Sequence, residues 1–177
     1  MSAIWSTVGS VGIASSADAS KLVIFDSIVQ LGPGTGIAGS IPAARIAGTP
    51  RIAGNLVTAV VRYGVDALDK ISEVAGLKLR FRDGNGFVTA RLIAVDRSTG
   101  AESPMVGFDS RVGYGNPSDS FRVLKSTTPD GKPIVIPSGA AAFYIELTLS
   151  AFEQIQVLPF PPAVSVIELV PPGPITE

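Results

Sequence analysis

Residues 77–97, LKLRFRDGNGFVTARLIAVDR, follow the most regular pattern in the chain, and this pattern restricts the fold more than any other feature. Apolar and cationic residues alternate through residues 77–82, so an extended strand there would have one apolar and one cationic face. Residues 83–86, DGNG, tolerate positive φ and are typical of a tight turn. Alternation then resumes, with apolar residues at the even positions from 88 to 94. We predict one long β-hairpin whose apolar residues pair across the strands, since a register shifted by one residue would place charge on the apolar face.

The second face of this predicted hairpin is cationic, and like charges at adjacent positions of a sheet are destabilising. Such a row is stable when carboxylates lie against it, or when it forms a solvated edge that blocks unwanted strand pairing. Three carboxylates of the preceding segment could provide the partners, from the same chain or from another copy. The candidate intersubunit charge contacts are therefore Lys78, Arg80, Arg82, Arg91, Asp66, Asp69 and Glu73.

The residue types that are missing exclude several classes of site. The 177-residue chain has no cysteine and no histidine, which excludes disulfides, zinc–thiolate sites and thiol catalysis, and removes the usual general base near neutral pH. Its 14 Lys and Arg residues against 15 Asp and Glu residues give a net charge of −1, which argues against binding nucleic acid through bulk charge. We expect a non-enzymatic protein with no cofactor, no metal site and no nucleic-acid partner.

The chain is unusually apolar for a sequence without a predicted membrane span. Charged residues make up 16% of it, against about 25% in typical soluble domains, and its mean hydropathy is +0.39. The uncharged run at residues 27–44 contains Pro33, Pro42 and several glycines, so it cannot form a membrane-spanning helix. We predict that the chain buries surface against copies of itself, as a homo-oligomer or polymer. The alternative is a well-packed sandwich with uncharged loops.

Residues 32–54 contain the tripeptide Ile-Ala-Gly three times, within a run rich in glycine and proline. The glycines and prolines are too frequent for a helix or a central strand, while the β-branched residues argue against simple disorder. The segment is either an extended arm that lies on a neighbouring subunit or a long ordered loop that covers its own sandwich. The candidate arm contacts are Ile37, Ile41, Arg45, Ile46, Arg51 and Ile52.

The rest of the pattern predicts an all-β fold in a single domain, residues 1–177. About nine short strands recur at roughly 8–12 residues, which is typical of an antiparallel β-sandwich, here jelly-roll-like with extended peripheral arms. Residues 4–14 and 21–31 would each be a strand, with a polar turn between them. Residues 64–76 have helical spacing and would form the one short helix. Residues 159–177 would be a Pro-rich linker, the last strand and a stiff tail.

Few residues suggest chemistry. Asp83 and Asn85 are spaced as in calcium loops, although a hairpin turn explains both. Asp109 and Asp119 could form the acidic pair of a hydrolase, which is the weakest of the functional hypotheses.

The sequence favours a non-catalytic structural subunit that self-assembles into a filament, tube or shell through its arm and apolar sandwich faces, in an extracellular or virion-associated assembly. The alternative function is a carbohydrate- or ligand-binding sandwich module whose candidate aromatic platforms are Trp5, Tyr63, Tyr114 and Tyr144.

Overall fold

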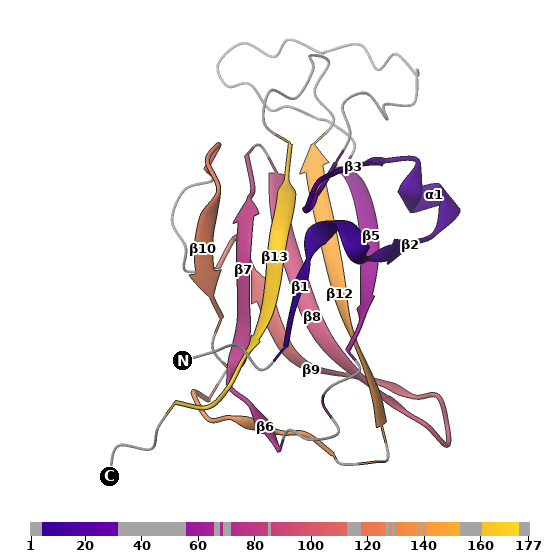
Figure 1. Cartoon of the computed structure of the whole chain (residues 1–177), viewed down its shortest axis with the longest axis vertical. Helices are drawn as coiled ribbons and strands as arrows, with labels where there is room; N and C mark the ends of the chain where they lie inside the picture. The colour runs from indigo at the N-terminus through magenta and orange to yellow at the C-terminus, as the bar shows by residue number, and fades with distance from the viewer. Residues whose placement is uncertain are drawn as a thin grey trace, which may run out of the picture.

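The computed structural model describes residues 5–31, 56–65, 68, 72–84, 86–112, 118–126, 128, 130–137, 139, 141–152 and 161–173. Within these ranges the chain is mostly β and all the strand pairs are antiparallel, which confirms the predicted antiparallel β architecture. The strands form two large sheets and one small one (Figure 1). A single turn of 3-10 helix, η1 (Gly9–Val11), and one short α-helix, α1 (Ser16–Ala19), lie near the N-terminus.

The first large sheet has six strands. β13 pairs with β7 on one side and with both β4 and β1 on the other, while β10 and β3 lie beyond β7 and β4 at the two ends of the order. These strands are β10 (Arg122–Lys125), β7 (Gly76–Arg82), β13 (Ala163–Val170), β4 (Ile28–Leu31), β3 (Leu22–Phe25) and β1 (Trp5–Val8).

The second large sheet has five strands in the order β2-β5-β12-β8-β9, and a small sheet pairs β11 with β6. The five strands are β2 (Ile13–Ala14), β5 (Leu56–Gly64), β12 (Ala141–Phe152), β8 (Gly86–Asp96) and β9 (Glu102–Asp109). The small sheet consists of β11 (Ile134–Val135) and β6 (Glu73–Val74). The central strand β12 pairs along nearly its whole length with both neighbours.

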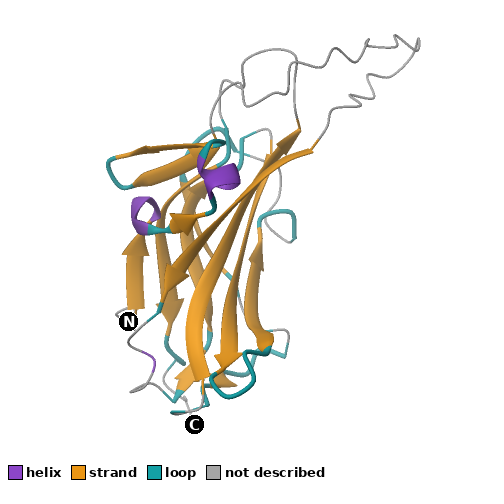
Figure 2. Cartoon of the chain, turned by 90° about the vertical axis from the view of Figure 1, so that its right-hand side faces the viewer, coloured by secondary structure: helices purple, strands orange, loops and turns teal. Residues whose placement is uncertain are grey.

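Both large sheets contribute alternate residues to one hydrophobic core. The six-stranded sheet lies in front of the five-stranded sheet in Figure 1, and Figure 2 shows the same strands from the side. Phe81 of β7 meets Phe108 of β9 edge to face, with ring centroids 5.1 Å apart, so these aromatic rings join the two sheets directly. In β12 the fully buried residues alternate with partly exposed ones; the former include Ile145, Leu147 and Leu149.

The predicted β-hairpin at residues 77–97 is wrong, because its two strands lie in different sheets. β7 pairs with β10 and β13, whereas β8 pairs with β12 and β9. The chain therefore passes from one sheet to the other between Arg82, which ends β7, and Gly86, which begins β8. The predicted faces are nevertheless correct, since the apolar residues of both strands are fully buried: Leu77, Leu79, Phe81, Val88, Ala90 and Leu92. The alternation shows which face of a strand is buried. It does not show whether the next strand lies beside it in the same sheet or across the core in the other sheet.

The predicted helix at residues 64–76 is wrong at both ends of the segment, while Leu68, between them, has 3-10 helical conformation; residues 66–67 and 69–71 lie outside the described residues. Gly64 ends β5, Glu73 and Val74 form β6, and Gly76 begins β7. The Val65 amide donates to the Phe143 carbonyl (3.1 Å) and the Ala75 amide donates to the Val170 carbonyl (2.9 Å), so both ends of the segment extend sheet pairing. The helical spacing of apolar residues arose from core contacts at the end of the sheets, since Val65, Leu68 and Val74 are all buried.

The N-terminal region folds into more elements than the two predicted strands. Residues 21–31 form the hairpin β3–β4, because Asp26 adopts a φ of 49° and reverses the chain. Residues 5–14 are divided by η1, where Gly9 lies so close to the Val164 carbonyl of β13 that a side chain would not fit. The short helix is α1, in the predicted turn, where the Ser15 hydroxyl accepts a hydrogen bond from the Asp18 amide (3.1 Å).

The contact between Phe81 and Phe108 provides a test of packing across the core. We expect the effects of Phe81→Leu and Phe108→Leu on the free energy of unfolding to be non-additive. The coupling free energy should be about 0.5–1.5 kcal/mol, the usual value for an aromatic pair. Urea unfolding of the wild type, both single variants and the double variant measures this coupling. Strictly additive effects would contradict the contact.

Candidate functional surface

The cations of β7 lie on the outer face of the six-stranded sheet and have partners within the chain. Lys78 forms an ion pair with Glu168 of β13 (2.6 Å), which is its neighbour in register. Arg82 donates to the Gln30 side-chain oxygen (3.3 Å) and to the Pro161 carbonyl (3.2 Å). The row is therefore a set of cross-strand contacts that hold β7 to its neighbours.

Arg80 is held by a β-bulge in β13. The register shifts between Val164, opposite Phe81, and Val166, opposite Arg80, which leaves Ser165 as the extra residue. The Ser165 hydroxyl accepts a hydrogen bond from the Arg80 guanidinium (2.9 Å) and donates to the Arg80 carbonyl (3.2 Å). Arg80 and Arg82 also lie over the Phe121 ring, at 4.8 and 5.4 Å from its centroid.

Arg91 lies on the outer face of the other sheet, so the structure does not bring it together with the cations of β7. Glu146 of β12 is opposite Arg62 of β5 and Arg91 of β8 in register. Its carboxylate accepts from both guanidinium groups, at 3.1 Å from Arg62 and 3.5 Å from Arg91. Arg62 also lies over the Tyr144 ring, 5.2 Å from its centroid. This row ties the three strands together on their solvent side.

The carboxylates that were predicted to face these cations are placed differently or not described. Glu73 lies in β6, in register with Val135 of β11, and Glu168 takes the predicted role opposite Lys78. Asp66 and Asp69 lie outside the described residues. So do all the candidate arm contacts, Ile37, Ile41, Arg45, Ile46, Arg51 and Ile52. Their roles stay predictions.

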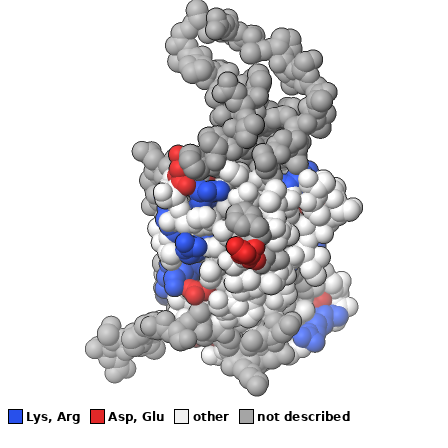
Figure 3. All heavy atoms as spheres, turned by 45° about the horizontal axis from the view of Figure 1, so that its top comes forward, with Lys and Arg blue, Asp and Glu red and all other residues white. Residues whose placement is uncertain are grey.

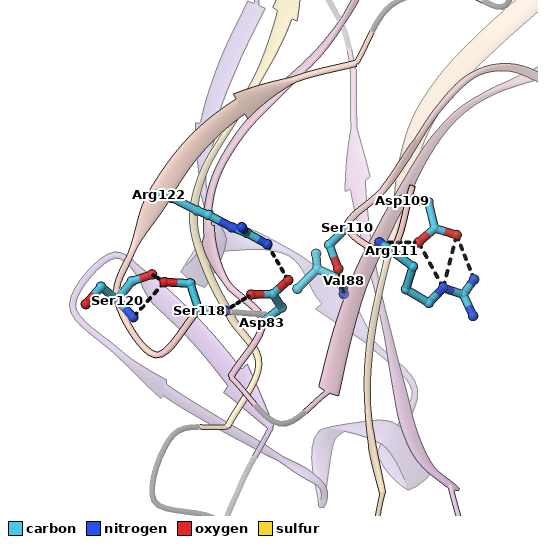
Figure 4. A network of polar contacts seen from close by, with 8 residues as sticks. All are labelled: Asp83, Val88, Asp109, Ser110, Arg111, Ser118, Ser120 and Arg122. Carbon is cyan, nitrogen blue, oxygen red and sulfur yellow. Dashed lines mark hydrogen bonds and ion pairs between the residues drawn. The ribbon is translucent and has the colours of Figure 1, made fainter. Parts of the chain in front are cut away.

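Asp83, at the turn between the sheets, is the most buried charged residue in the described part of the chain, with 2% of its surface exposed. Its carboxylate accepts from Arg122 (2.6 Å) and from the Ser118 amide (2.8 Å), as Figure 4 shows. The Gly84 amide in turn donates to the Ser118 carbonyl (2.9 Å). These contacts lock the turn against the segment that leads into β10. The carboxylate that the calcium-loop hypothesis required is thus directed at protein donors.

Asp109 is also used within the protein. Its carboxylate forms an ion pair with Arg111 (2.6 Å), and this hydrogen bonding lowers the pKa of Asp109 (Figure 4). Arg111 lies over the Phe87 ring, 4.2 Å from its centroid. Asp119 is exposed. Among the described residues, no three carboxylates gather in a way that could hold a metal ion.

Most of the aromatic residues that were candidates for binding carbohydrate pack against other residues of the protein. Tyr63 is buried, and its hydroxyl donates to the Gly9 carbonyl (2.7 Å); burial raises the pKa of this phenol. Trp5 packs against the core, and Tyr144 lies under Arg62. Tyr114 is outside the described residues.

Exposed apolar side chains are the feature that the sequence could not locate. Ile13 of β2 is 78% exposed and Ile24 of β3 is 54% exposed, and both belong to the N-terminal region. Val11, Val23 and Leu56 are further exposed apolar residues. The space-filling view shows blue and red groups scattered over a mostly uncharged surface (Figure 3). No helix of the described chain is long and apolar enough to span a membrane.

No protein-family model matches the sequence, and a search of curated proteins finds no match.

The buried ion pair provides a stability prediction. We expect Asp83→Asn to lower the free energy of unfolding by about 3 kcal/mol, because it leaves Arg122 without its carboxylate in a site where that side chain is only 21% exposed. Urea unfolding measures the loss. Asp119→Asn is the matched control, because Asp119 is exposed and lies shortly before Arg122 in the sequence. It should change the free energy of unfolding by less than about 0.5 kcal/mol. Equal effects of the two substitutions would contradict the role of the pair.

The Asp96 turn gives a pH prediction. Its carboxylate accepts from the Ser98 hydroxyl (2.6 Å), the Thr99 amide (2.9 Å) and the Ser98 amide (2.8 Å), which lowers the pKa of Asp96 to about 2. Because the folded pKa lies below the unfolded value of 3.8, these bonds stabilise the fold above about pH 4 and are lost as the pH falls toward 2. Asp96→Ala should therefore lower the thermal midpoint at pH 6, and the difference from wild type should vanish near pH 2. A difference that is independent of pH would refute this.

Proposed function

We propose that this protein is a non-catalytic structural subunit that assembles with copies of itself into a filament, tube or shell. The observation that carries the proposal is the set of exposed apolar side chains in the N-terminal region, on a chain with only 16% charged residues. Large exposed apolar patches on soluble proteins usually mark surfaces that are covered by a partner. Copies of the same chain are the simplest partner, since most soluble oligomers are homo-oligomers.

In this proposal the two large sheets form a jelly-roll-like sandwich that serves as the rigid building block. Support comes from the shared core, the edge-to-face contact between Phe81 and Phe108, and the reversal of the chain from sheet to sheet at Asp83. The outer faces of both sheets are held by cross-strand charge contacts, centred on Glu168 and Glu146. A stiff body of this kind suits repeated use in an ordered assembly.

Residues 32–54 would act as the arm between subunits. The described chain stops at Leu31 of β4 in the six-stranded sheet and resumes at Leu56 of β5 in the five-stranded sheet. Its isoleucines would provide apolar contacts. Arg45 and Arg51 are its only charged residues, so few charges would have to lose water in the contact.

Assembly and its dependence on the arm can be measured by sedimentation velocity. We expect the wild type to form particles much larger than 18.2 kDa at micromolar concentration. Deletion of residues 37–54 should abolish assembly while the β signal in circular dichroism is kept. A second variant, with Ile37, Ile46 and Ile52 replaced by serine, keeps the length of the segment and should give the same result. A stable wild-type monomer would refute the proposal.

A further inference from the structure

Strand β3 lies at an edge of the six-stranded sheet and presents an unusually apolar sequence there. Its four residues, LVIF, all favour strands and include no charge and no proline. Ile24 is 54% exposed and Val23 is also exposed. The β3–β4 hairpin stands out from the upper part of the body (Figure 2). One side of β3 pairs with β4, and the backbone groups of its other side have no strand beside them in the described chain.

Two other edge strands of the described chain, β9 and β10, carry features that block pairing. β10 contains Arg122 and Lys125. β9 contains Glu102, Pro104 and an irregular register with β8. Charged residues, proline and irregularities are the usual means by which sheet edges avoid pairing with other chains.

The remaining edges of the large sheets are polar, short or covered. β1 includes Ser6 and Thr7 among its four residues, and β2 has only two residues. Beside β2, the edge of β5 is approached by α1, and Lys21 donates to the Thr58 carbonyl (2.9 Å). Among the described edge strands longer than two residues, β3 alone has no polar residue, proline or cover.

We propose that the free edge of β3 pairs with β3 of a second copy, antiparallel and about a twofold axis at Val23. The inference rests on the proposed self-assembly and names one of its contacts. An antiparallel pair related by a twofold axis must place a residue opposite one of the same parity, so that side chains keep their faces. With the axis at Val23, Leu22 lies opposite Ile24 in both halves, and every central pair is apolar.

Charge also favours this antiparallel arrangement. Lys21 precedes β3 and Asp26 follows it. In this register Lys21 lies opposite Phe25, and Ser20 lies opposite Asp26. Each end of the joined ribbon would therefore hold the Lys21 charge of one copy and the Asp26 charge of the other, one position apart along the strand. Asp26 is exposed, and the Lys21 ammonium donates to Asp18 and to the Thr58 carbonyl, which leaves its third N–H for a new acceptor. A parallel arrangement would instead place like charges at the same end. The contact joins two six-stranded sheets and is closed by its own symmetry.

A cysteine cross-link tests the register directly, because the natural chain has no cysteine. Residues opposite each other in an antiparallel pair have Cα atoms about 4.5–5.5 Å apart, which a disulfide can span. We expect oxidised full-length Val23→Cys to run mainly as a covalent dimer on a non-reducing gel. Val123→Cys, at a 52% exposed position on the charged edge strand β10, is the matched control and should remain mainly monomeric. Equal cross-linking of the two variants would overturn the proposal.

A second measurement separates this contact from assembly through the arm. Ile24→Lys should weaken the dimeric contact at least about tenfold in sedimentation equilibrium, whereas Val123→Lys should leave it unchanged. If Ile24→Lys has no effect while deletion of residues 37–54 abolishes assembly, the β3 contact is wrong and the proposed function stands. If Val23→Cys cross-links but the wild type forms no particle larger than a dimer, the β3 contact stands and the proposed polymer is wrong.

Discussion

The inward side chains of β7, β8, β12 and β13 form the centre of the core. Leu79, Leu92, Leu147 and Ile167, one from each strand, are fully buried. Each such side chain contributes about 1.5–3 kcal/mol of hydrophobic stabilisation. These residues belong to two sheets that share one core, so neither sheet can bury its apolar face without the other. The order of the strands, the sheet-to-sheet turn and the outer charge contacts all depend on this shared core.

Polar contacts stabilise the connection between the sheets and the pairing of strands on their outer faces. The chain changes sheets between β7 and β8, and the buried carboxylate of Asp83 holds the start of this connection through Arg122 and the Ser118 amide. On the outer faces, Glu168 and Glu146 each sit opposite arginine or lysine in register. Glu146 joins β12 to its two neighbouring strands and Glu168 joins β13 to β7, so these charges are used for cross-strand pairing. Several apolar side chains remain exposed, and Ile13 and Ile24 of the N-terminal region are among them.

The faces of the strands could be predicted from the sequence, whereas their partners could not. Alternation correctly identified the buried side of β7 and β8, but it is a local property and does not distinguish pairing within a sheet from packing across a core. The helical spacing near Leu68 was extended too far, since the two ends of that segment join strands although Leu68 has 3-10 conformation. Lys78, Arg80 and Arg82 were correctly grouped on one face, but Arg91 was assigned to the wrong sheet and Glu168 was not identified as the carboxylate partner. Finding that partner required the position of β13, which is more than eighty residues away in the chain.

An N-terminal hairpin with an unprotected edge and an arm between the two sheets would together give each subunit two different contacts. A twofold contact alone closes into a dimer, whereas a second, different contact allows a dimer to grow into a larger assembly. Negative-stain electron microscopy of the purified full-length protein would show whether the subunits assemble. We expect ordered filaments, tubes or shells with a regular repeat. A uniform field of single 18.2-kDa particles at the concentrations used for assembly would contradict it.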